Sequence, residues 1–415
     1  MALLKLTQRS SPASRPEWQL ILTCARTRLD DRCQSRMREL LRGPLDWDEF
    51  VSLASQHGVE ALVSRHLSEA ISGAVPPVAL ACVEENARRS GRWNLLLAGR
   101  MIALLEEFRR AGVLAVPYKG PTLASLAYGN LALRPSSDLD FAVPQRELPR
   151  AYEVVIAAGF RASLDPAKAL DASYLALGNP GQHCFVYEPD LLIELHTEKT
   201  LRYFPVPLDW DKLRARLETV SVGGHPVPTF SLEDTFIFLS VHGAKHFWNR
   251  LMWICDVAEL AQVPRAIDWE LSERLAAEMG CRRMWLLGLS LANEILDAPL
   301  PASVLQSICS DPVVAALGRR VRSHLFGRQS ASPSAPARLL FRLRSYDSLA
   351  DGSRQCLRMA TEPTEEDWRA HALPEWATPL HALLRPWRLL HRHGLGLRPK
   401  PEAGTEVLPG DAEPR

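Results

Sequence analysis

Two aspartates separated by one residue stand out in the segment Asp138-Leu139-Asp140-Phe141. In a β-strand, residues i and i+2 point to the same face, so Asp138 and Asp140 are expected to project together while Leu139 and Phe141 turn into a core. Two neighbouring carboxylates repel each other and are costly to bury. A divalent cation relieves that repulsion. Hard oxygen ligands suit Mg²⁺, with Mn²⁺ as an alternative.

A third carboxylate stands on a second expected strand, Leu191–His196. The alternation of apolar residues there puts Glu194 and His196 on the opposite face. If the two strands adjoin, Glu194 joins Asp138 and Asp140 in a site that could hold two metal ions for in-line displacement at a nucleotide phosphate. We expect Glu194 to ligate one ion or to take the proton of the attacking hydroxyl, and His196 to orient Glu194 or to line the cleft.

A second group of residues is suited to phosphate. Lys119-Gly120 falls at an expected strand-to-helix junction, where glycine lets the backbone approach an oxyanion. Lys119 adds charge, Thr122 a hydroxyl donor and Arg134 a planar fork that matches phosphate oxygens. The alternative is that Lys119 and Arg134 are ordinary surface charges, just as Asp-x-Asp pairs also occur on solvated turns.

The order of these motifs resembles a known family. Lys119-Gly120, a short helix ending in Tyr128-Gly129, and then Arg134-x-x-Ser137-Asp138-Leu-Asp140 are similar to the bacterial nucleotidyltransferases often described as uncharacterised, the fifth NTP-transferase group of the DNA-polymerase-β-like superfamily. The resemblance covers about residues 30–300 and, more weakly, 363–390. It implies a polymerase-β-like core, dependence on a divalent metal, transfer of a nucleotidyl group from an NTP, and a place for Ser137 beside the nucleotide.

The same resemblance includes a histidine-rich segment, His242-Gly-Ala-Lys245-His246-Phe-Trp248, followed by Trp253 and Asp256. His242 and His246 lie four residues apart, on one face of an expected helix. They are either a metal pair or a packed pair at a domain interface. We expect His242, Lys245 and His246 to contact the nucleotide or the acceptor across the cleft. We expect Asp256 to cap a helix or to pair with a histidine.

The overall charge restricts the acceptor. With 49 Lys and Arg against 48 Asp and Glu, the formal net charge is +1, whereas binders of long nucleic acids usually carry a basic excess. A small molecule, a sugar or a peptide is therefore the favoured acceptor. Two other functions stay open: a non-catalytic module that binds a nucleotide or a partner on the same fold, and a toxin-like transferase that modifies tRNA or protein.

The eight cysteines have no metal-binding spacing and sit mostly among apolar residues, which is typical of free thiols in a reducing cytoplasm. We expect neither a signal peptide nor a transmembrane segment. The segment Leu380–Leu390 has helical apolar spacing with three arginines nearby. It is expected to dock on the body of the protein, with contact to a membrane surface as the alternative.

Helical periodicity on both sides of a strand-rich centre predicts an α+β fold, with a small mixed sheet between helical regions. A helix is expected over 78–111, and strands over 139–143, 183–188 and 191–196, the last two joined by a hairpin turn at Pro189-Asp190. The expected parts are a flexible leader (1–16), a helical N-terminal region (17–112), the nucleotidyltransferase core (113–230), a helical domain (231–326), a linker (327–338), a C-terminal helical segment (339–395) and a disordered tail (396–415).

Overall fold

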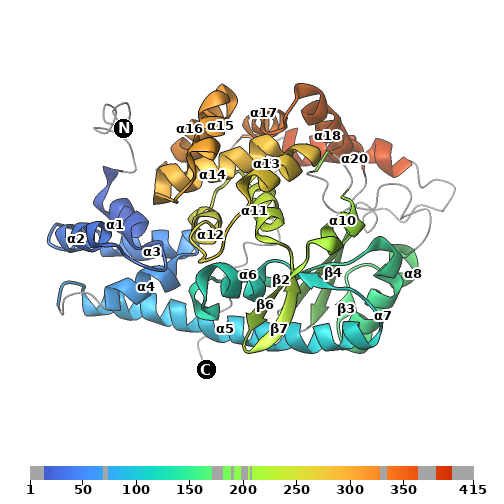
Figure 1. The fold of residues 1–415 in the computed structure, drawn as a ribbon, viewed down its shortest axis with the longest axis horizontal. Coiled ribbons are helices and arrows are strands. Elements are labelled where there is room, and N and C mark those ends of the chain that lie inside the picture. Colours follow the sequence, from blue (N-terminus) through green and yellow to red (C-terminus); the bar gives the residue numbers. More distant parts are fainter. Residues whose placement is uncertain are drawn as a thin grey trace.

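The computed structural model describes residues 14–68, 73–170, 181–187, 191–197, 204–205, 208–327, 334–362 and 380–394. Within these residues the chain is α+β, as expected, with a small mixed sheet surrounded by helices (Figure 1). None of the described helices combines the length and apolarity needed to cross a bilayer.

The central sheet has five strands in the order β1-β2-β5-β4-β3. Strands β2 and β5 are parallel, whereas the pairs β1–β2, β5–β4 and β4–β3 are antiparallel. The antiparallel pairing of β4 with β5 confirms the expected hairpin strands, although residues 188–190 of its turn lie outside the described residues. The strands are β1 (Val116–Pro117), β2 (Asp138–Ala142), β3 (Arg161–Ala162), β4 (Gln182–Tyr187) and β5 (Leu191–His196).

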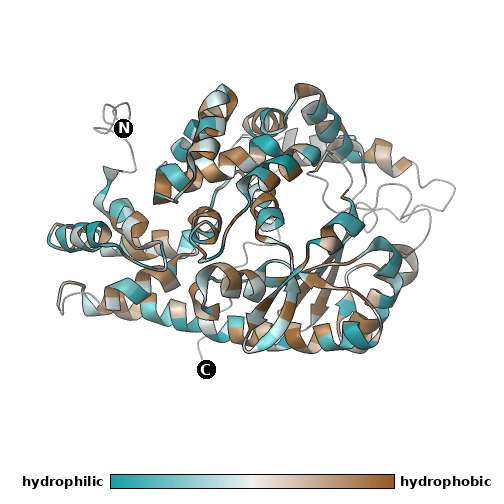
Figure 2. Ribbon diagram, in the orientation of Figure 1, coloured by the Kyte–Doolittle hydropathy of each residue, from teal (hydrophilic) through white to brown (hydrophobic). Residues whose placement is uncertain are grey.

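One face of this sheet is apolar and buried. Leu139, Phe141, Ile193 and Leu195 are at most 1% exposed, and they pack with residues of α5 (Pro77–Arg110) and α7 (Leu148–Ala157). Figure 2 shows the strands as largely hydrophobic. Period-two alternation then forces the intervening polar residues of β2 and β5 onto the opposite face.

Helix α5 is the longest element, with 34 residues, and confirms the helix expected over 78–111. It runs beneath both the N-terminal helices and the sheet (Figure 1). Its buried positions include Leu97, Met101, Leu104 and Phe108, at spacings of three and four. The N-terminal helices are α1 (Pro16–Cys24), α2 (Asp31–Leu40), α3 (Trp47–His57) and α4 (Glu60–Ser68), of which α3 and α4 pack on α5.

Between β1 and β2 the chain makes three short turns of helix, and a second, two-stranded sheet follows the central one. The short turns are α6 (Gly120–Leu123), the π-turn η2 (Ala124–Tyr128) and the 3₁₀ turn η3 (Leu131–Leu133). The remaining elements of this region are η4 (Gln145–Glu147), α8 (Pro166–Ala169), α10 (Trp210–Ala215), β6 (Glu218–Val222) and β7 (His225–Thr229).

Helices return after residue 230. Ser231 caps α11 through a hydrogen bond from the Asp234 amide. The helices are α11 (Leu232–Lys245), α12 (Leu251–Leu260), α13 (Trp269–Glu278), α14 (Arg282–Leu296), α15 (Ala302–Ser310), α16 (Pro312–Leu325), α17 (Ala335–Ser345), α18 (Leu349–Thr361) and α20 (Leu380–Gly394).

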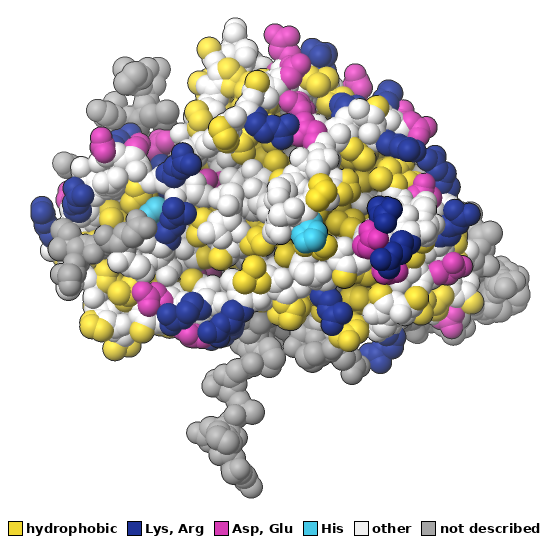
Figure 3. All heavy atoms as spheres, turned by 60° about the horizontal axis from the view of Figure 1, so that its bottom comes forward, with side chains coloured by type: hydrophobic (Ala, Val, Ile, Leu, Met, Phe, Trp, Pro, Cys, Tyr) yellow, Lys and Arg dark blue, Asp and Glu magenta, His cyan; other side chains and the backbone are white. Residues whose placement is uncertain are grey.

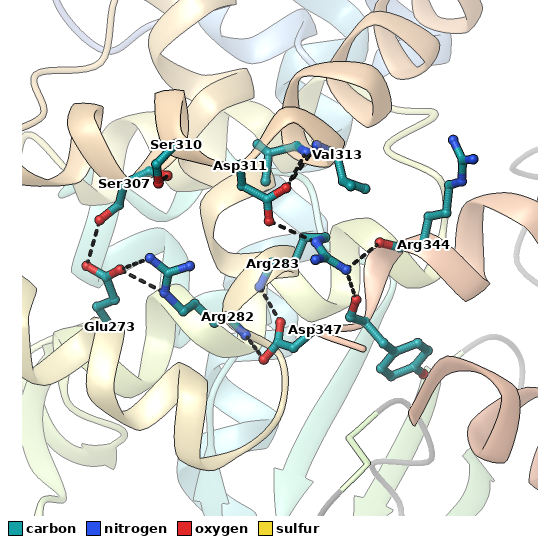
Figure 4. Close-up of polar contacts among 11 residues, drawn as sticks. Glu273, Arg282, Arg283, Ser307, Ser310, Asp311, Val313, Arg344 and Asp347 are labelled. Carbon is teal, nitrogen blue, oxygen red and sulfur yellow. Dashed lines mark hydrogen bonds and ion pairs between the residues drawn. The ribbon is translucent and has the colours of Figure 1, made fainter. Parts of the chain in front are cut away.

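A polar network fastens the C-terminal helices to α14 (Figure 4). The Asp347 carboxylate accepts the backbone amides of Arg282 and Arg283 at 3.1 and 2.7 Å, which satisfies the otherwise free N–H groups at the start of α14. The Arg283 guanidinium pairs with Asp311 at 2.9 Å and donates to the backbone carbonyls of Arg344 and Tyr346. Helices α14, α16 and α17 are therefore held together by charged groups as well as by packing.

Buried apolar side chains form two clusters, one around the central sheet and one that joins the N-terminal helices to α11–α17. Helix α17 begins at Ala335, so the last part of the range expected as a linker (327–338) is helical. Residues 1–13 of the expected leader and the whole expected tail, 396–415, lie outside the described residues. On the face shown in Figure 3, basic and acidic side chains are interspersed, in keeping with the balanced charge of the chain.

Candidate functional site

The acidic residues of β2 and β5 meet on the polar face of the sheet. The two strands are parallel neighbours, and their register sets Asp140 directly beside Glu194 and Ala142 beside His196. Asp138 shares the face of Asp140, two positions earlier on the same strand. The three acids thus share one face of two adjacent strands, and among the described residues Asp140 and Glu194, with His196, are the ones whose possible ligand atoms lie close together.

The side-chain nitrogens of Lys119 and His196 contact two of these acids. Asp140 Oδ1 lies 3.0 Å from Lys119 Nζ and 2.8 Å from His196 Nε2, and Glu194 Oε2 lies 3.2 Å from the same Nε2. Asp140 is 3% exposed and His196 is 7% exposed. His196 therefore sits between two carboxylates at the centre of the site, a more central position than the orienting or cleft-lining role expected for it.

The pKa of Asp138 is shifted in the opposite direction from the pKa values of Asp140 and Glu194. Burial, reinforced by the neighbouring Asp140 carboxylate, raises the pKa of Asp138 to about 7. Burial also opposes ionisation of Asp140 and Glu194, but Lys119 and His196 outweigh it and hold the pKa of both carboxyls below the usual range. The carboxylates in turn raise the pKa values of Lys119 and His196 despite burial, so Lys119 is a permanent cation here.

The donor set fits a divalent cation. The ligating atoms of Asp140, Glu194 and His196 all lie within 4.8 Å of one another. Nδ1 of His196 is buried, and within the described part of the chain it has no hydrogen-bond partner. Oxygen donors suit Mg²⁺ and Mn²⁺, and an imidazole nitrogen moves the preference toward Mn²⁺ and other transition metals. The residues present can therefore bind such an ion once Lys119 and His196 give up part of their contact with the acids.

The turn between β1 and α6 brings Lys119 to the acids. Gly120 has φ +54°, a left-handed conformation that favours glycine. A Cβ added at Gly120 would lie 3.3 Å from the Asp138 carbonyl oxygen, so a side chain there would press on the first acid-bearing residue. Gly120 is thus required both by its backbone conformation and by the close approach of β2.

Arg134 has a partner other than the expected phosphate. Its Nε and one terminal nitrogen donate to the two carboxylate oxygens of Asp256 at 2.7 and 2.9 Å, and Tyr128 donates to the same carboxylate at 2.7 Å. Arg134 is 5% exposed and Asp256 1%. This bidentate pair corrects two expectations, because it commits the guanidinium of Arg134 to Asp256 and gives Asp256 an arginine in place of a histidine or a helix cap.

Thr122 is also turned away from the site. Its side chain is fully buried, and its hydroxyl donates to Met101 Sδ of α5 at 3.3 Å. Thr122 therefore packs α6 against α5 and is not available as a phosphate donor. Ser137, in contrast, is exposed immediately before Asp138, and Lys119 remains at the acids, so these two and Gly120 are the expected phosphate residues that the fold leaves near the site.

Asn94 is a positioning residue that the sequence reasoning missed. It is fully buried on α5, and its Nδ2 donates to the carbonyls of Leu131 and Arg134 at 2.7 and 2.6 Å. With the Arg134–Asp256 pair, this fixes the segment leading into β2 from both α5 and α12. The available signal was an asparagine on the same helical face as Leu97 and Met101, where a polar residue needs a specific partner.

The expected histidine pair forms an aromatic cluster with α12. The rings of His242 and His246 lie 4.8 Å apart, and each also contacts Trp253, at 5.3 and 5.0 Å. Burial and the charges of neighbouring cations, Lys119 among them, hold the pKa of both histidines well below the usual range. Both rings are therefore neutral at pH 7, and Lys119 is near enough to act on both.

A strained turn follows these histidines. Phe247 and Trp248 have φ of 58° and 53°, which is unusual for residues with bulky side chains. Trp248 is fully buried, and a Cβ added at Gly243 would lie 2.5 Å from its ring. The glycine of the His-Gly-x-x-His segment thus admits the tryptophan that directs the chain from α11 into α12.

Comparison with known proteins gives one match. The model of a family described as uncharacterised nucleotidyltransferase matches residues 43–297, which include all the side chains discussed for this site. No curated protein and no solved structure matches the chain.

Proposed function

The chain belongs to the uncharacterised nucleotidyltransferase family, and from this premise we propose that it transfers an NMP group from an NTP to an acceptor, with release of pyrophosphate. The observation that supports the proposal is the placement of Asp138, Asp140 and Glu194 on one face of two adjacent parallel strands, with Asp140 directly beside Glu194. We assign the catalytic core to the polymerase-β-like fold and bound it at 113–230, between helical regions on either side.

Asp138, Asp140 and Glu194 would hold the metal, Mg²⁺ or Mn²⁺, with His196 as an additional nitrogen donor. When bound, up to two such ions supply charge neutralisation at the phosphate oxygens and lower the pKa of the attacking hydroxyl. Asp138, whose pKa is about 7, then loses its proton because only the carboxylate ligates. Glu194 either ligates or accepts the proton of the acceptor.

In the transfer, the acceptor oxygen forms a bond to the α-phosphorus, and the bond from that phosphorus to the bridging oxygen of the β-phosphate breaks. Pyrophosphate leaves, and the acceptor proton passes to Glu194 or to water. Lys119 would move from Asp140 to the phosphate oxygens, and Ser137 and the backbone of Gly120 would complete the contact. The neutral rings of His242 and His246, with Lys245, would border the nucleotide or the acceptor.

The near-neutral chain favours a small molecule, a sugar or a peptide as acceptor over a long nucleic acid. All eight cysteines are free, which suits a reducing cytoplasm where NTPs are also abundant.

The test uses purified protein, cell extract as the source of acceptor, Mg²⁺ or Mn²⁺, and each NTP labelled in turn at the α- and γ-phosphate. We expect label from the α-position on the acceptor and label from the γ-position in pyrophosphate. The Asp140→Asn variant should lose the transfer by about 10³-fold or more, because the amide removes the negative charge and one of the two oxygens that could ligate the metal. Asp211→Asn removes an acid whose side chain is 83% exposed and serves as the matched control.

Three results would argue against the proposal: transfer of the γ-label, transfer without a divalent metal, or equal activity of Asp140→Asn and the control. Metal-dependent nucleotide binding with no transfer to any acceptor would instead indicate a binding module.

A further inference from the structure

Helix α20 presents its apolar side outward. Leu380, Leu383, Leu384 and Trp387 follow the spacing i, i+3, i+4 and i+7, which places them on one helical face. All four are exposed, Leu383 at 73% and Trp387 at 64%. The contact with α18 is instead made on another side of the helix, where Arg385 Nε donates to the Met359 carbonyl at 2.9 Å. The helix therefore docks on the body, as expected, but Leu380, Leu383, Leu384 and Trp387 face away from that contact.

The helices beside α20 extend this pattern. Leu349 and Leu357 of α18 are 69% and 64% exposed, and Leu339 and Leu340 of α17 are exposed too. Helix α17 packs on α18 and α18 on α20, side by side at one end of the molecule (Figure 1). The network of Figure 4 fastens α17 to α14, so these leucines are presented by an anchored group of helices.

The same three helices are strongly basic. They contain three, two and three arginines respectively, and Asp351 is their one acidic residue. Their net charge is therefore +7, whereas the whole sequence has a net charge of +1, so the rest of the chain is net acidic. Exposed leucines and a tryptophan among arginines match the composition of helices that lie in the headgroup layer of a membrane.

We propose that the α17–α18–α20 surface binds the surface of a membrane rich in anionic phospholipids. Arginines would contact the phosphate groups, and the leucine stripe of α20 would enter the boundary between headgroups and acyl chains to a depth of about 5–10 Å. Trp387 suits that boundary because its ring is apolar while its N–H is polar. Self-association through the same surface is disfavoured, because a two-fold contact would set the arginines of one copy against those of the other.

The test is flotation of the full-length protein with vesicles of phosphatidylcholine alone and with vesicles that also contain phosphatidylglycerol. We expect binding to the anionic vesicles, weakened by high salt and by omission of phosphatidylglycerol. Leu383→Glu should reduce the partition coefficient at least about tenfold, because it puts a charge in the centre of the stripe. Leu95→Glu alters a leucine that is 61% exposed on α5, far along the sequence, and should bind as the wild type does.

The proposal is overturned if the wild-type protein does not float with anionic vesicles, or if Leu383→Glu and Leu95→Glu bind equally. It is also overturned if the wild type stays with the lipid-free fraction and forms dimers that Leu383→Glu disrupts, because the stripe would then be a self-association surface. Nucleotidyl transfer in solution is measured on the same variants and should be unchanged, so that failure of the membrane proposal is distinguishable from failure of the enzymatic one.

Discussion

Replacement of Asp256 by leucine should destabilise the protein strongly, because it leaves the Arg134 guanidinium buried without a counter-charge. The two hydrogen bonds of 2.7 and 2.9 Å between these residues involve charged groups, each contributing about 1.5–3 kcal/mol. Loss of one partner of a buried pair costs about 3–5 kcal/mol in free energy of unfolding. Tyr128 loses its acceptor in the same variant.

The informative comparison is with Arg134→Met and with the double variant, in which both charges are absent. Without a buried charge, the double variant should cost only about 1–3 kcal/mol, the penalty of the unpaired Tyr128 hydroxyl. Chemical denaturation followed by tryptophan fluorescence gives the four free energies of the cycle. If the two single losses simply add in the double variant, Arg134 and Asp256 do not act as a pair, and the account of how β2 is positioned is refuted.

Three further predictions concern packing, pH and nucleotide contact. Gly243→Ala should lower the free energy of unfolding by about 1–3 kcal/mol, because its methyl group would overlap Trp248. Gly99→Ala should not, because a Cβ there meets no atom of the described residues within 4 Å, and thermal unfolding compares the two variants. Burial lowers the pKa of His57 to about 4, so on acidification the unfolded chain takes up the proton before the folded one. The contribution of His57 to the free energy of unfolding is complete above pH 6.5 and falls by up to about 3 kcal/mol between pH 6.5 and 4. Denaturation of His57→Gln over the same pH range should lack this decrease. Thr122→Val should leave the KM for NTP unchanged in steady-state assays, since its hydroxyl contacts Met101; a KM raised tenfold would restore it as a phosphate ligand.

The acid-bearing strands were accessible from the sequence because their pattern is local. Alternation in Asp138-Leu139-Asp140 and around Glu194 determines which side chains share a face, and burial of one face specifies the register strongly. The long helix over 78–111 was equally plain from its apolar spacing. The parallel pairing of β2 with β5 brings together carboxylates more than fifty positions apart, and here the pattern fixed the face while the fold fixed the neighbour.

The partners of individual polar groups were not accessible in the same way. Arg134 has the composition of a phosphate ligand, but its carboxylate partner arrives from α12, over a hundred residues later. Thr122 is polar, yet its small size lets it pack between α6 and α5 with one hydroxyl contact. For α20 the apolar spacing was clear, but periodicity gives only the existence of a stripe and not the direction in which it faces.

Helix α5 determines how short a fragment of this chain can be if it is to keep its fold. At 34 residues it is about 51 Å long, and it contributes Asn94, Met101 and Phe108 to the support of the strands while its first half packs on α3 and α4. A fragment that began at residue 113 would expose the apolar face of the sheet, and one that ended at residue 230 would leave the buried Arg134 without Asp256. A recombinant fragment that retains a working set of acids must therefore start before residue 77 and extend beyond α12.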